Sequence, residues 1–260
     1  MKKIYMWLLL LSAALSLSGC VSTSSGAPPL AKQDAASQAK DIARVHTELA
    51  SEYFSRTQYG VALEELHEAL KADPGYGPAY GLMGLVYMEL REDALAVKNF
   101  EQALRLNPAD SDANNNYGWY LCNRGQEAAS IKYFLTAQKN PLYTTPERSF
   151  LNAGICSRKM GDEVAAEGYL RKALAQQPDL QQALYQLADL NYKRNSLAEA
   201  RAYMGRLMRN ANPNAEYLWL GVRIERKLGN RDNERGYAEQ LRRRFPNASE
   251  TQALLAGRFE

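Results

Sequence analysis

Cysteine is the residue type whose chemistry is easiest to read from its position in this chain. The 260-residue sequence contains three cysteines, and the first of them, Cys20, ends the tetrapeptide Leu-Ser-Gly-Cys. Two lysines, Lys2 and Lys3, and an apolar run over residues 4–17 precede it. That run has the length of a signal-peptide hydrophobic region and is too short for a membrane-spanning helix. The sequence therefore predicts a signal peptide over residues 1–19, with the Cys20 thiol at the mature N-terminus.

An apolar region that ends in small residues and a cysteine resembles the lipobox of bacterial lipoproteins, in which that thiol is acylated. The resemblance implies a lipid-anchored protein, because several buried acyl chains hold a protein firmly on a membrane. Val21 follows Cys20 where an aspartate would redirect sorting. In proteobacterial lipoproteins this implies the outer membrane, on its periplasmic face. An ordinary secretory signal with a chance cysteine is the alternative interpretation.

The composition is that of a folded body behind a lipid tether. Residues 20–40 are rich in Ser, Ala, Gly and Pro, so we expect a flexible tether there and a folded domain over 41–260. Without the two lysines of the signal peptide, 30 basic residues face 29 acidic ones. This balance argues against nucleic acid as a partner.

Few other residues have types and spacing suited to catalysis. The two histidines, His46 and His67, lie in helical patterns where packing or exposure explains them. The sequence has no glycine-rich phosphate loop, no H-E-x-x-H and no C-x-x-C. We therefore expect no catalytic residue, no metal site and no cofactor, and we interpret the chain as a binding module and not an enzyme.

The body repeats itself with a period near 34 residues. Prolines at the ends of amphipathic segments, from Pro74 to Pro246, are separated by 34, 33, 37, 35 and 33 residues. This is the tetratricopeptide period, in which each unit is a pair of antiparallel helices. We expect an all-α superhelix of about six pairs and a C-terminal capping helix. The expected repeats are 43–76, 77–110, 111–146, 147–180, 181–213 and 214–247, with the cap over 248–260.

Small residues mark where the two helices of a unit should cross. In the second repeat these are Gly84 and Ala96, with Phe100 on the same face of the second helix. A close crossing leaves no room for a large side chain. The sixth repeat departs from the pattern, because Asn233 takes the place of the small residue.

The first helices of such repeats line a concave face where partners usually bind. Repeat register assigns Phe54, Leu85, Met88 and Trp119 to that groove. These four would form an apolar strip that accepts an amphipathic helix or an extended peptide. The alternative is that neighbouring helices cover them.

Cys122 and Cys156 fall near the ends of first helices in consecutive repeats. Because such helices run side by side, the Cα atoms could fall within the 4.4–6.8 Å that a disulfide requires. In an oxidising compartment an even pair of cysteines favours a disulfide. Two buried thiols that act as small apolar residues are the alternative.

Two stretches give the repeats a more specific likeness. One is Asn-Asn-Tyr-Gly-Trp-Tyr-Leu at 115–121, and the other is the lengthened junction Asn-Pro-Leu-Tyr-Thr-Thr-Pro-Glu-Arg-Ser at 140–149, followed by Asn-Ala-Gly at 152–154. Together with the lipobox and the number of units, they resemble the PilF/PilW family of type IV pilus biogenesis and stability lipoproteins.

The resemblance implies a pilotin. Such a lipoprotein brings the pilus secretin subunit to the outer membrane, supports its multimer and so serves pilus assembly and twitching. It implies Cys20 as the lipid site, the early first-helix groove as the partner surface, and a monomer that binds a PilQ-like secretin. A periplasmic adaptor that scaffolds cell-wall hydrolases or other envelope enzymes is the alternative.

Overall fold

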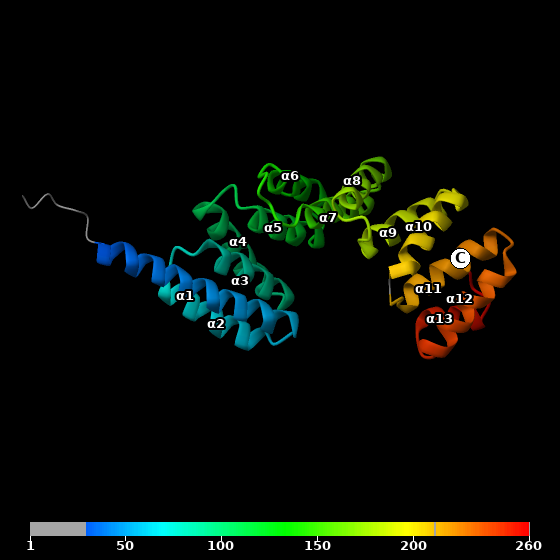
Figure 1. Ribbon diagram of the computed structural model, residues 1–260, viewed down its shortest axis with the longest axis horizontal. Helices are drawn as coiled ribbons and strands as arrows, with labels where there is room; N and C mark the ends of the chain where they lie inside the picture. Colours follow the sequence, from blue (N-terminus) through cyan, green and yellow to red (C-terminus); the bar gives the residue numbers. More distant parts are fainter. Residues whose placement is uncertain (1–29, 211, 260) are drawn as a thin grey trace, which may run out of the picture. The chain divides into compact units, whose positions relative to one another are not determined.

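The computed structural model describes residues 30–210 and 212–259, and over these ranges every regular element is an α-helix (Figure 1). The predicted signal peptide and Cys20 lie outside the described residues. By its contacts the chain divides after Ala39, and the repeat body is the unit Lys40–Glu260. None of the described helices is both long enough and apolar enough to cross a membrane.

The described helices form the six expected pairs and the cap, which confirms the predicted all-α tetratricopeptide superhelix. In chain order they are α1 (Leu30–Ser55), α2 (Tyr59–Ala72), α3 (Gly77–Glu89), α4 (Asp93–Leu106), α5 (Ser111–Asn123), α6 (Glu127–Ala137), α7 (Pro146–Lys159), α8 (Glu163–Gln176), α9 (Gln181–Lys193), α10 (Leu197–Asn210), α11 (Ala215–Lys227), α12 (Arg231–Arg244) and α13 (Ser249–Leu255).

The first helix begins earlier than the sequence predicts, so the expectation of a flexible tether as far as Lys40 is wrong. Helix α1 starts at Leu30, directly after Pro29. The next ten residues contain four alanines and neither proline nor glycine. Alanine has the highest intrinsic helix propensity, so this segment forms a helix although it lacks an apolar stripe.

The turn inside each pair is closed by one residue with left-handed backbone geometry. Three of the six are glycines with φ between 72° and 78°, and the other three have φ between 59° and 61°. In chain order they are Thr57, Arg91, Gly125, Gly161, Asn195 and Gly229. Because this conformation ends a helix and reverses the chain within three residues, each pair is a tight antiparallel hairpin.

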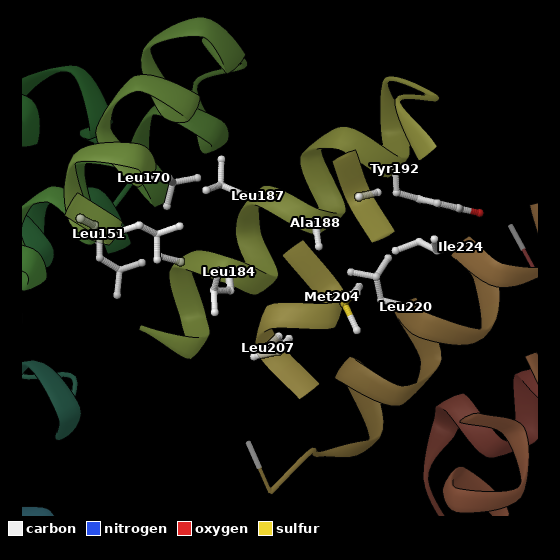
Figure 2. Close-up of a cluster of buried hydrophobic side chains, with 14 residues drawn as sticks. Leu151, Leu170, Leu184, Leu187, Ala188, Tyr192, Met204, Leu207, Leu220 and Ile224 are labelled. Atoms are coloured by element: carbon white, nitrogen blue, oxygen red, sulfur yellow. The ribbon is translucent and has the colours of Figure 1, made fainter. Parts of the chain in front are cut away.

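Side chains fill the space where the helices of a pair cross. A Cβ atom added at Gly84 would lie 2.5 Å from Cε1 of Phe100, and one at Gly154 would lie 2.7 Å from Cγ of Leu170. The predicted close crossing is therefore confirmed. Buried clusters also join neighbouring pairs, and Figure 2 shows one that includes Leu151 of α7, Leu187 of α9 and Leu220 of α11.

Candidate partner-binding site

The structure brings the four predicted groove residues to a single hollow of about 440 Å³. Phe54 comes from α1, Leu85 and Met88 from α3, and Trp119 from α5. The other lining residues lie on α3, α5, α7 and α9 or directly before α9: Glu89, Asn115, Asn116, Arg148, Leu151, Asn152, Leu180 and Gln182. Apart from Leu180, every residue that lines this apolar hollow lies on the first helix of a pair, as the repeat register predicts.

The four residues differ in how much of their surface remains open. Phe54, Leu85 and Trp119 are half-buried, whereas Met88 is only 7% exposed. Met88 belongs to the core cluster that contains Phe100 and Tyr120. The prediction of an accessible side chain is thus wrong for Met88, because the packing of the third repeat against the second covers it. The other three keep part of their surface open to solvent.

Amide side chains form the polar part of the hollow. Asn115 is 1% exposed; its Oδ1 accepts a hydrogen bond from Nδ2 of Asn152 at 3.0 Å, and its own Nδ2 donates to Oδ1 of Asn116 at 3.3 Å. Asn116 and Asn152 were not among the predicted groove residues, although both lie in the stretches that carry the family likeness. Because an amide offers both donors and acceptors, the half-buried side chains of Asn116 and Asn152 suit the backbone of a bound peptide, and Asn115 positions them.

The two cysteines of the repeat body lie behind this surface. A disulfide joins Cys122 and Cys156, whose Cα atoms are 5.9 Å apart and whose side chains are buried. They pack with Phe134 and Ala153, and Trp119 lies against the same cluster. The pairing is the one that the sequence predicts, and it anchors one wall of the apolar hollow to the fourth repeat.

The histidines make local contacts that explain their presence. Nδ1 of His46 lies 2.7 Å from Oε2 of Glu65, and this contact joins α1 to α2. Nδ1 of His67 lies 2.6 Å from the carbonyl oxygen of Leu63, one helical turn earlier. Among the residues that the structure describes, no group of three His, Cys, Asp or Glu side chains is arranged to hold a metal ion.

Comparison with known proteins places this geometry in a family. Models of the tetratricopeptide repeat match residues 77–110, 99–132 and 159–216. The crystal structure of PilW, described as a widely conserved type IV pilus biogenesis factor, is 36% identical, with a TM-score of 0.74 over 82% of this chain and 98% of that one. The chain belongs to the PilF/PilW family of type IV pilus biogenesis proteins.

A second relative extends the likeness to nearly the whole chain. The type IV pilus assembly protein PilF of Pseudomonas aeruginosa is 29% identical over 243 residues, which are 94% of this chain and 95% of that protein. The structure of Pseudomonas aeruginosa PilF has a TM-score of 0.75 with 27% identity, over 85% of this chain and 99% of that one. This PilF/PilW protein is thus a tetratricopeptide-repeat protein of type IV pilus biogenesis, built on a fold that binds proteins.

Proposed function

We propose that this PilF/PilW protein is a pilotin-type assembly factor that binds the secretin subunit of the type IV pilus in the apolar hollow and supports the secretin multimer. The observation that carries the proposal is the convergence of half-buried Phe54, Leu85 and Trp119 from three successive first helices on one hollow. Membership of a pilus assembly family supports a pilus component as the occupant.

The chemistry of the hollow defines the kind of segment that it takes. A volume of about 440 Å³ holds a few apolar side chains. Trp119 offers a large rigid surface, and aromatic residues of this kind often contribute most of the energy at interfaces. The half-buried amides of Asn116 and Asn152 lie beside it and can pair with a peptide backbone, and buried Asn115 holds both of them in place. We therefore infer that the secretin segment inserts apolar side chains and presents its backbone to these amides.

The lipid anchor is the second part of the proposal. Cys20 would carry acyl chains and hold the repeats at the periplasmic face of the outer membrane, where a secretin multimer forms. The support is the lipobox-like Leu-Ser-Gly-Cys and the valine at position 21. A monomer is sufficient for this role, because the hollow is complete within one chain.

A charge placed in the hollow tests the docking site. Leu85→Glu puts a carboxylate among apolar groups and should reduce the co-purification of secretin at least tenfold, which corresponds to a loss of about 1.4 kcal/mol or more at a central contact. The matched control is Leu90→Glu, because Leu90 follows α3, is 42% exposed and does not line the hollow. Circular dichroism and thermal melting must show that both variants are folded.

Two further readouts separate docking from anchoring. Secretin multimers on immunoblots should fall in Leu85→Glu and persist in Leu90→Glu. Cys20→Ala should leave the repeats folded and remove the protein from the outer-membrane fraction. A folded Leu85→Glu variant with normal secretin multimers would exclude the hollow as the docking site, and normal outer-membrane location of Cys20→Ala would exclude the lipid anchor. Recovery of peptidoglycan enzymes without secretin would favour an adaptor role.

A further inference from the structure

A second group of chemically unusual side chains lies on the first helices of the last three repeats. Asp189 of α9, whose side chain is 10% exposed, accepts a charged hydrogen bond from Arg158 of α7 at 2.5 Å. The Nζ atom of Lys193 lies 3.1 Å from the same carboxylate, and Arg223 of α11 lies 4.0 Å from it. One carboxylate therefore faces three cations.

Arg223 is the cation whose hydrogen-bond donors are not all paired within the described residues. Its side chain is 16% exposed, its Nε atom is buried without a hydrogen-bond partner, and its shortest contact with an acid is the 4.0 Å distance to Asp189. The guanidinium lies over the rings of Tyr192 and Trp219, at 4.9 and 5.9 Å from their centroids. Buried polar groups in proteins almost always have partners, so the unpaired Nε shows that Arg223 keeps a donor that no described residue satisfies.

An aromatic ring and a second, exposed cation lie beside Arg223. Tyr192 extends from α9 in Figure 2, and Nζ of Lys227 lies 4.3 Å from the centroid of the same ring. Lys227 is exposed and makes no ion pair with any described residue. The basic cluster of Arg158, Lys193, Arg223 and Lys227 thus carries four positive charges, and the carboxylate of Asp189 lies within 4.0 Å of three of them.

We propose that the basic cluster is a second docking site, which binds an acidic segment of a partner protein through an Asp or Glu side chain that pairs with Arg223 and Lys227. A side-chain carboxylate is slim enough to reach a recessed guanidinium, and Asp189 already provides the example of a carboxylate that fits among these cations. Planar carboxylates match the fork of donors on arginine. The site lies on α7, α9 and α11, which are first helices like those that line the apolar hollow, and it does not depend on the identity of the partner there.

The test uses the full-length protein in detergent and an end-blocked, fluorescein-labelled hexaglutamate peptide, with hexaglutamine as the uncharged peptide. Fluorescence anisotropy should show saturable binding of hexaglutamate only. Arg223→Gln and Lys227→Gln should each weaken it at least fivefold. Arg231→Gln, which removes the same charge from the exposed start of α12, should change it less than twofold. Lys227→Gln keeps the test valid if Arg223→Gln does not fold, because Lys227 is exposed.

The outcomes decide the proposal in both directions. Saturable binding that depends on Arg223 or Lys227 and not on Arg231 supports the second docking site. Absence of hexaglutamate binding, or equal weakening by all three variants, overturns it and leaves the cluster as a structural link between repeats. Binding of phosphatidylglycerol vesicles through Lys227 without binding of the peptide also overturns it, since the ligand would then be a lipid phosphate.

Discussion

The position of Leu85 on α3 depends on how closely α3 packs against α4. A methyl group added at Gly84 tests that close packing. In Gly84→Ala the new Cβ would lie 2.5 and 2.6 Å from Cε1 and Cδ1 of Phe100. Phe100 is fully buried, and the rings of Tyr117 and Tyr120 lie 5.4 and 5.6 Å from its ring centroid. The phenyl ring has no free space to enter, so the two helices must separate instead.

Two opposing effects set the magnitude. Replacing glycine by alanine within a helix stabilises it by about 1 kcal/mol, while inserting a methyl group into a filled core costs about 1–3 kcal/mol. Gly81→Ala is the matched control, because Gly81 lies on the same helix and a Cβ there would meet nothing within 4 Å. We expect Gly81→Ala to stabilise the protein by about 1 kcal/mol and Gly84→Ala to destabilise it by up to about 2 kcal/mol.

Thermal melting followed by circular dichroism measures the difference. For a body of this size, about 1 kcal/mol shifts the melting temperature by roughly 2–4 °C, so the two variants should lie on opposite sides of the wild type. Combining Gly84→Ala with Phe100→Leu should recover part of the loss in Gly84→Ala, since the smaller side chain makes room for the methyl group. If Gly84→Ala melts as high as Gly81→Ala, the close crossing does not exist and the reasoning is refuted.

Two other perturbations act on the later repeats. Replacing Cys122 and Cys156 by serine should cost about 2–4 kcal/mol of unfolding free energy, and mass spectrometry of envelope protein alkylated without reduction should find neither thiol free; two free thiols would contradict the pairing. Burial raises the pKa of Asp189, but hydrogen bonds from Arg158 and Lys193 outweigh this and lower it below its ordinary value. The resulting stability is present above about pH 4 and is lost as the pH falls. Asp189→Asn should therefore cost about 3 kcal/mol at pH 7 and less at pH 3, whereas exposed Asp179→Asn should cost little at either pH; an equal cost of Asp189→Asn at both pH values would contradict this.

Local residue types were sufficient to predict the helix pairs and the positions of the groove residues. At the crossings, a Cβ atom on Gly84 or Gly154 would clash with a side chain of the facing helix, so the sequence places glycine there. The period of 34 residues reappears in the left-handed turn residues, even where Thr57 or Arg91 stands in place of glycine. These features depend on contacts inside one repeat, and a repeat is short enough for its pattern to be visible in the sequence.

Features that depend on contacts between repeats were harder to predict. Register places Met88 on the groove side of α3 but does not indicate that the third repeat buries it. Asn233 occupies a slot for a small residue because its Nδ2 donates to Oε2 of Glu225 at 3.4 Å. Glu225 is 3% exposed and also pairs with Arg201 of the preceding repeat at 3.0 Å. Nothing in the spacing of the sixth repeat alone reveals that pairing.

The geometry of the apolar hollow is therefore fixed by residues that do not line it. Phe100 of α4 and Phe134 of α6 fill the crossings beneath α3 and α5, and the disulfide holds α5 to α7 behind Trp119. A tightly packed core transmits small displacements, so a change at these buried positions should move Leu85 or Trp119 relative to its neighbours. Loss of partner binding in a core variant consequently does not identify a contact residue. Only a pair such as Leu85→Glu and Leu90→Glu, both shown to be folded, separates the surface that touches the partner from the packing that shapes it.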